Sequence, residues 1–180
     1  MDAELGRLFL DRAREKLLVE YRAKIRLAVE ALPDEALWWR ANEQSNSVGN
    51  LLLHLTGNVR QWMISGVGGA PDTRHRAAEF AAADGGSRAD MLKDLNALFD
   101  EVDVVLGALT PETLIERRTI QGRDLSVLDA IFICVEHFAL HLGQIILIAK
   151  QRAPGAVHFY EDAGGLARPI WKEHVGAKGV

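Results

Sequence analysis

Apolar residues recur with the period of an α-helix in four long stretches of the chain. Over residues 3–32 the apolar positions return about every 3.6 residues, with Arg12 as the one break in the stripe. The other three predicted helices cover residues 48–67, 87–109 and 126–153. No segment alternates apolar and polar residues for long enough to predict a sheet. Four amphipathic helices joined by connectors of mixed length indicate an all-α fold, a four-helix bundle.

Residues outside these helices predict loops and a tail. Residues 72–86 are charged and alanine-rich and end in Asp-Gly-Gly, which favours a loop. Residues 116–123 are compatible with a small hairpin-like excursion. We therefore expect one bundle domain over residues 1–153, followed by an irregular tail over residues 154–180 that packs on the bundle. The aromatic residues that favour this packing are Phe159, Tyr160 and Trp171.

Composition and charge narrow the class of protein. The chain has 180 residues, about the length of one domain. Its single cysteine, Cys134, excludes an internal disulfide framework and a multi-cysteine zinc cluster. The net charge of −4 gives no general attraction to nucleic acid or to an anionic membrane. The first residues lack the basic start and apolar stretch of a secretory signal. The apolar stretch 125–149 carries ionisable groups that are costly in lipid. We expect a cytoplasmic protein that binds neither nucleic acid nor membrane.

Three histidines lie in apolar stretches of two predicted helices. His137 and His141 are spaced i, i+4, which places both imidazoles on one helix face about 6 Å apart along the axis. Two nitrogens so placed are able to converge on one cation with bonds of roughly 2.0–2.1 Å. His54 lies in a leucine-rich stretch of the second helix and provides a third ligand. The pattern favours a three-histidine metal site with positions left for water or substrate.

Other residues near the histidines leave alternatives open. A buried histidine is often a hydrogen-bonded core residue, so a bundle without metal is one alternative. Cys134 lies on the same stripe as His137 and is either a fourth ligand or, as we favour, a small apolar core residue. Glu136 points about 100° away from His137 around the helix and is not expected to be a ligand. The sequence indicates no acid or base beside the site. Candidates for orienting the ligands or the substrate are Asn58, Gln61 and Gln144.

Two motifs resemble those of the DinB-like (YfiT-like) superfamily of metal-binding proteins. The first is the second-helix motif Ser47-Val48-Gly49-Asn50-Leu51-Leu52-Leu53-His54-Leu55, and the second is the late motif His137-Phe138-Ala139-Leu140-His141-Leu142-Gly143-Gln144-Ile145. The turn at residues 122–128 is also similar, and the resemblance covers about residues 5–153. It implies an up-down-down-up bundle and a divalent metal, usually nickel or zinc, held by His54, His137 and His141. It also implies a homodimer and, in characterised members, thiol-dependent enzymes.

These observations support a metal-dependent enzyme as the first hypothesis. The metal would activate water or a low-molecular-weight thiol for hydrolysis of, or thiol transfer to, a small-molecule substrate. Whether the protein is an enzyme stays open at this point. The alternative is a non-catalytic dimeric bundle in which a structural metal joins two helices of a binding or stress-response module. The substrate and the catalytic residues are not identified by the sequence.

Overall fold

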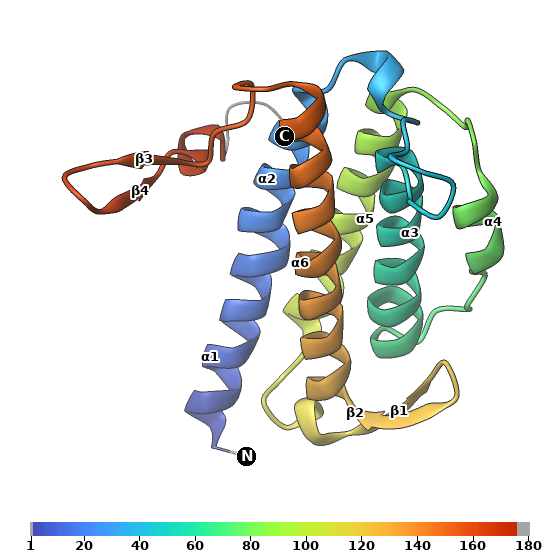
Figure 1. Ribbon diagram of the computed structural model, residues 1–180. Helices are drawn as coiled ribbons and strands as arrows, with labels where there is room; N and C mark the ends of the chain where they lie inside the picture. Colours follow the sequence, from blue (N-terminus) through green and yellow to red (C-terminus); the bar gives the residue numbers. More distant parts are fainter. Residues whose placement is uncertain (1, 176–180) are drawn as a thin grey trace.

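The structure, a computed structural model, describes residues 2–175 and is mostly helical (Figure 1). Its long helices run up, down, down and up in chain order, which confirms the predicted all-α bundle (Figure 1). The first long helix consists of α1, a π-helical turn and α2. The second consists of α3 and a π-helical extension, while α5 and α6 are the third and fourth. The bounds are Ala3–Arg14 for α1, Glu15–Tyr21 for the π turn, Arg22–Glu30 for α2, Val48–Val59 for α3, Arg60–Val67 for its extension, Arg88–Ala108 for α5 and Val127–Arg152 for α6.

Capping boxes fix the starts of α3 and α6. The Ser47 hydroxyl accepts a hydrogen bond from the Asn50 backbone N–H at 3.1 Å, and the Asn50 side chain accepts one from the Ser47 N–H at 3.2 Å. Ser126 and Asp129 form the same reciprocal pair at the start of α6. Such pairs satisfy backbone donors that a helix N-terminus leaves without partners. They set the positions at which both helices begin, and therefore the faces that their histidines occupy.

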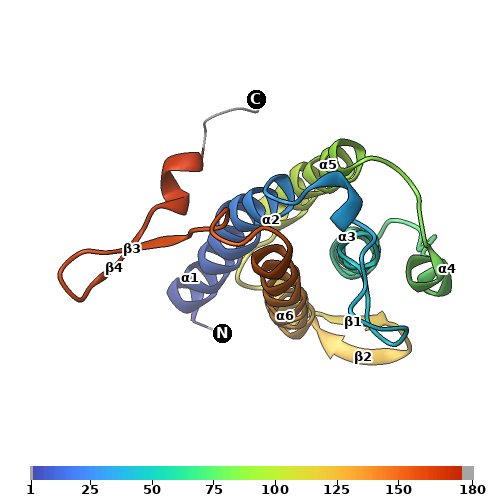
Figure 2. The ribbon, with the colours of Figure 1, turned by 45° about the horizontal axis from the view of Figure 1, so that its top comes forward.

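The core lies where α2, α5 and α6 meet α3 (Figure 2). Phe138 of α6 is fully buried, and its ring stacks on Tyr21 at 5.7 Å and lies 5.6 Å from Phe99 of α5. In the described part of the chain, α6 is the one helix long and apolar enough to cross a membrane by length and composition. It packs against α2 and α3 as one of the four helices of the bundle.

Short elements connect or follow the long helices. The predicted hairpin near residues 116–123 is present, as an antiparallel pair of strands, β1 and β2. The prediction of a loop over residues 72–86 is wrong in part, because a short helix, α4, forms there and packs against α3. The tail is also less irregular than predicted, since β3 and β4 form a second antiparallel hairpin. The bounds are Arg76–Ala81 for α4, Arg117–Ile120 for β1, Arg123–Ser126 for β2, Tyr160–Asp162 for β3 and Ala167–Pro169 for β4.

Lys24 joins the tail to α2. Its side chain is enclosed, with the residue only 9% exposed, and Nζ donates hydrogen bonds to Glu20 Oε1 at 2.6 Å and to the Tyr160 hydroxyl at 2.9 Å. The same ammonium lies 5.1 Å from the centre of the Tyr160 ring, 5.4 Å from that of Trp171 and 5.9 Å from that of Phe159. A carboxylate and aromatic faces together compensate a buried ammonium for its lost hydration. The tail aromatic residues therefore contact the bundle through this lysine.

Candidate metal centre

His54 of α3 and His137 and His141 of α6 lie together in the bundle. One ring nitrogen from each of the three lies within 4.8 Å of the others. The Nε2 atoms of His54 and His137 are 2.9 Å apart, and the ring centres of His137 and His141 are 4.5 Å apart. The structure thus brings together the three histidines predicted as ligands. His54 is buried, whereas His137 and His141 are half-buried, so the cluster is closed on the α3 side and partly open on the α6 side.

Hydrogen bonds orient two of the three imidazoles. His54 Nδ1 lies 2.8 Å from Glu79 Oε2, and His141 Nδ1 lies 2.8 Å from Gln144 Oε1. Because a carboxylate oxygen and an amide oxygen accept hydrogen bonds, these two contacts favour a proton on Nδ1 of both rings, and at His54 the nearer Glu79 oxygen competes with the donor Nη2 of Arg74, which lies 3.1 Å from the same Nδ1. The Nε2 atom of a neutral ring then carries the free lone pair. Histidine ligands of metals commonly donate their second N–H to a carboxylate or carbonyl in this way.

The protonation states suit metal ligands. Burial lowers the pKa of His54, and the positive charge of Arg74 acts in the same direction, whereas the hydrogen bond with Glu79 opposes both. Burial, together with the neighbouring histidines, lowers the pKa of His137 to about 4. Both rings are therefore neutral near pH 7 and have a lone pair to donate.

The donor set fits a divalent metal of the nickel or zinc type. Imidazole nitrogens suit these ions, which bind them at about 2.0–2.1 Å. Two such bonds at 90–110° place their nitrogens about 2.8–3.4 Å apart. The observed 2.9 Å between the Nε2 atoms of His54 and His137 lies within that range. The residues present therefore fit a divalent metal ion.

Glu79 and Arg74 complete the site and were not anticipated from the sequence. Arg74 donates from Nε to Glu79 Oε1 at 2.7 Å and from Nη2 to Glu79 Oε2 at 2.9 Å. The side chains are only 4% and 10% exposed, respectively. Burial acts to raise the pKa of Glu79, but the hydrogen bonds and charges of Arg74 and His54 outweigh it and keep this pKa below its usual value. The expectation that no acid lies beside the histidines is wrong, since Glu79 is in direct contact with His54.

The placement of Glu79 depends on how α4 packs on α3. Asn50 Nδ2 donates to the backbone carbonyls of Glu79 at 2.9 Å and Ala82 at 2.8 Å, at the end of α4. Gly57 provides the space, because a Cβ atom there would lie 2.1 Å from Glu79 Oε1. A glycine inside a helical stretch often marks close approach of another group. Gly57 is therefore the sequence signal from which the contact might have been inferred.

The three residues proposed to orient ligands or substrate have different surroundings. Gln144 contacts His141, as described above. Gln61 contacts Arg74 instead, accepting a hydrogen bond from Nη1 at 2.9 Å, and so lies one residue further from the histidines. Asn58 is buried in α3, four residues after His54. A role of any of them toward substrate stays a prediction.

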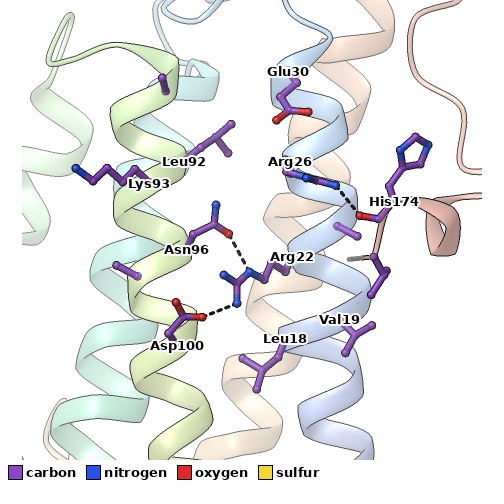
Figure 3. Close-up of a pocket in the computed structure, with 14 residues that line it drawn as sticks. Leu18, Val19, Arg22, Arg26, Glu30, Leu92, Lys93, Asn96, Asp100 and His174 are labelled. Carbon is purple, nitrogen blue, oxygen red and sulfur yellow. Dashed lines mark hydrogen bonds and ion pairs between the residues drawn. The ribbon is translucent and has the colours of Figure 1, made fainter. Parts of the chain in front are cut away.

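A groove of about 740 Å³ lies elsewhere, between α2 and α5 (Figure 3). Arg22 of α2 crosses it to donate to Asn96 Oδ1 at 2.9 Å and Asp100 Oδ1 at 2.7 Å of α5 (Figure 3). None of the three clustered histidines lines this groove. The arrangement of metal-binding groups therefore places the candidate site between α3 and α6 rather than in this groove.

Cys134 is expected to be unreactive in the folded protein. It is fully buried, outside the three-histidine cluster, and burial raises the pKa of its thiol to about 12. Because thiolates are the reactive form, an aromatic disulfide reagent such as DTNB should label less than one tenth of the protein within an hour at pH 8. Denaturant should release one equivalent of thiol at once. Rapid labelling of the native protein would contradict the assignment of Cys134 to the core.

Comparisons with known proteins agree with this arrangement. The family described as Protein of unknown function (DUF1572) matches residues 4–157. Among curated proteins, none matches the chain. The solved structure of a DinB-like protein, YjoA, from Bacillus subtilis is similar with a TM-score of 0.63 and 17% identity, over 83% of this chain and 97% of that one. A DinB-like protein from Bacillus cereus is similar with a TM-score of 0.52 and 19% identity, over 77% of this chain and 91% of that one.

At these identities the two structures show a shared fold and no more. The family match covers most of the chain, including His54, His137 and His141. The match to the family model carries the family assignment. The bundle and the order of its helices agree with the fold of the two solved structures. The chain belongs to the DUF1572 family, and its fold is that of DinB-like proteins.

Proposed function

We propose that His54, His137 and His141 bind one divalent metal ion, nickel or zinc, and that the protein is a metal-dependent enzyme acting on a small molecule. The observation that carries this proposal is the cluster itself, with three ring nitrogens within 4.8 Å of one another. When bound, such a metal supplies Lewis acidity and lowers the pKa of water or of a low-molecular-weight thiol toward neutrality. The corresponding reactions are hydrolysis or thiol transfer.

The surroundings of the cluster favour a catalytic over a structural role. Catalytic zinc sites combine three protein ligands with an open position, whereas structural sites have four protein ligands. The described chain groups three ligands here, and Cys134 is not among them. His137 and His141 are half-buried, so small molecules have access from the α6 side. Glu79 and Gln144 hold the rings in place, and neither is needed as a ligand.

Metal content tests the ligand assignment. Protein purified without nickel resin is expected to contain about one equivalent of metal by mass spectrometry, and alanine variants of His54, His137 and His141 should each lose most of it. His158→Ala is the matched control, because His158 is an exposed histidine of the tail and should not affect metal content. Metal-free protein that also takes up no added nickel or zinc would overturn the proposal.

Activity of the loaded protein separates the two roles of the metal. We expect the metal-loaded protein to hydrolyse p-nitrophenyl acetate or to transfer cysteine to 1-chloro-2,4-dinitrobenzene with release of chloride. We expect this activity to be lost when the metal is removed. A structural metal would instead leave both activities at the level of the His137→Ala variant, while its removal by a chelator would lower the unfolding temperature. That result would support the alternative, a dimeric bundle with a structural metal.

Gly57→Ala is expected to weaken metal binding without removing a ligand. The new Cβ would lie 2.1 Å from Glu79 Oε1 and displace the carboxylate from His54. Loss of such a supporting hydrogen bond costs about 10–100-fold in metal affinity. Competition with a chromogenic chelator measures the change. In the control variant Gly107→Ala the nearest atom to the new Cβ is 3.6 Å away, so its affinity should equal that of the wild type. Unchanged affinity in Gly57→Ala would argue against a role of Glu79 in positioning His54.

We also propose that the protein is a cytoplasmic homodimer. Large apolar side chains are exposed on α1 and on α6, which contact each other in the bundle. These side chains are Leu5, Leu8, Phe132, Leu140 and Leu147. Large exposed apolar side chains gathered on neighbouring helices favour an interface. Light scattering should give twice the mass of one chain, and a Leu8→Glu, Leu140→Glu double variant should give the mass of one chain. A monomeric wild type would contradict this proposal and leave the metal site unaffected.

A further inference from the structure

A second arginine of the α4 region, Arg76, lies beside the three-histidine cluster. Its guanidinium stacks over the ring of Phe80, with Cζ 4.8 Å from the ring centre. The Phe80 ring lies in turn 4.6 Å from the ring of His54. Arg76 and Phe80 are four residues apart and so share one face of α4. The guanidinium is thereby held one aromatic ring away from a proposed metal ligand.

The charge of Arg76 is not neutralised within the described part of the chain. Arg74 forms an ion pair with Glu79, whereas no carboxylate of residues 2–175 lies within ion-pair distance of Arg76. Arg76 is exposed to solvent, so its donors are accessible. An exposed guanidinium without a carboxylate partner thus lies one aromatic ring away from His54.

The acids near the site do not offset this charge. Glu79 is held by two hydrogen bonds from Arg74 and one contact with His54. Glu136 precedes His137 on α6, but it is exposed and successive side chains of a helix point about 100° apart. A ligand at the cluster therefore meets a positive group with free donors, and a guanidinium binds a carboxylate through two parallel hydrogen bonds.

We infer that Arg76 is a specificity-determining residue and that the small-molecule ligand of this centre carries a carboxylate. The inference rests on the proposed function, because the small molecule in question is the one that would bind to the proposed metal. Stacking on Phe80 limits the freedom of the guanidinium before the ligand arrives, which lowers the entropy lost on binding. A neutral ligand of the same size gains nothing from Arg76. Preference for the anionic ligand is the property that this arrangement provides.

Two thiols measure this preference in cobalt-loaded protein. 3-Mercaptopropionate and 2-mercaptoethanol both present a thiol to the metal, and only the first carries a carboxylate. Their binding is followed by the sulfur-to-cobalt absorption band, which needs no turnover. We expect 3-mercaptopropionate to bind the wild type about tenfold more tightly or better, as for a hydrogen bond to a charged group. Arg76→Ala should abolish this preference and leave the Kd of 2-mercaptoethanol unchanged, while Arg76→Lys should retain part of it.

The controls separate the failure of this inference from that of the proposed function. Arg12→Ala removes an exposed arginine of α1 that pairs with Glu15, and it should preserve the wild-type preference. Equal affinities of the wild type for the two thiols would overturn the inference, as would an unchanged preference in Arg76→Ala. Failure of the wild type to take up cobalt would overturn the proposed function and this inference with it. Uptake of cobalt with no thiol preference overturns the inference alone.

Discussion

Replacing Glu79 with alanine is expected to lower the free energy of unfolding of the metal-free protein by about 3–5 kcal/mol. The variant leaves the Arg74 guanidinium, 4% exposed in the wild type, without its carboxylate. It also leaves Nδ1 of the buried His54 without its acceptor. A buried charge that loses its partner has lost its hydration without compensation. Urea denaturation followed by circular dichroism measures the change.

Two further variants show whether burial is the cause. Glu79→Gln keeps an oxygen that is able to accept from His54 and removes the charge, so its destabilisation should be smaller. Glu101→Ala removes an ion pair with Arg60 whose side chains are 46% and 43% exposed, respectively, and this change should cost no more than about 1 kcal/mol. If Glu79→Ala and Glu101→Ala were equally stable, the buried contact among Arg74, Glu79 and His54 would not contribute to folding as described.

Replacing Phe138 with alanine is expected to lower the free energy of unfolding by about 3–5 kcal/mol. Phe138 is fully buried and contacts Tyr21 of the first long helix and Phe99 of α5. Its removal opens a cavity where three helices meet, and close-packed helices close such a cavity only in part. The measurement is the unfolding free energy from guanidinium denaturation, with the slope checked against the wild type to establish that the native state stays compact.

The same helix provides a matched control for Phe138. Phe132 lies six residues earlier on α6 and is 58% exposed. Phe132→Ala makes the identical chemical change at the surface, where substitutions are usually within about 0.5 kcal/mol. Similar losses in the two variants would contradict the position assigned to Phe138 in the core. Because Phe132 is among the side chains proposed for the dimer interface, both variants are compared in the monomeric Leu8→Glu, Leu140→Glu background, where subunit dissociation does not contribute.

The long helices follow from local signals in the sequence. The apolar period of 126–153 and the pair Ser126 and Asp129 predict a helix that the structure places at Val127–Arg152. The spacing of His137 and His141 fixes their common face by helix geometry alone. His54 was expected to join them because the leucines around it place it on the buried side of its own helix. Local pattern thus accounted for the fold and for the three clustered histidines.

The parts that were missed depend on contacts between distant segments. α4 is six residues long and has no apolar stripe, so nothing local separates it from a loop. Glu79 is buried because Arg74 and His54 pair with it, and sequence patterns treat a glutamate in a charged segment as a surface residue. The tail hairpin has exposed strands without apolar alternation, and Lys24, which anchors it, occupies an ordinary position in a helical pattern.

The distribution of the site along the chain has a consequence for how the protein folds. His54 contacts Glu79 across 25 residues and His137 across 83 residues. Contacts over such separations must offset the entropy of loop closure, which the local contacts of a helix do not, so we expect the helices to form before the histidines meet. A chain emerging from the ribosome exposes His54 long before His137 is synthesised. The proposed metal would therefore enter after the bundle closes, as a ligand that stabilises the folded state rather than one that starts folding.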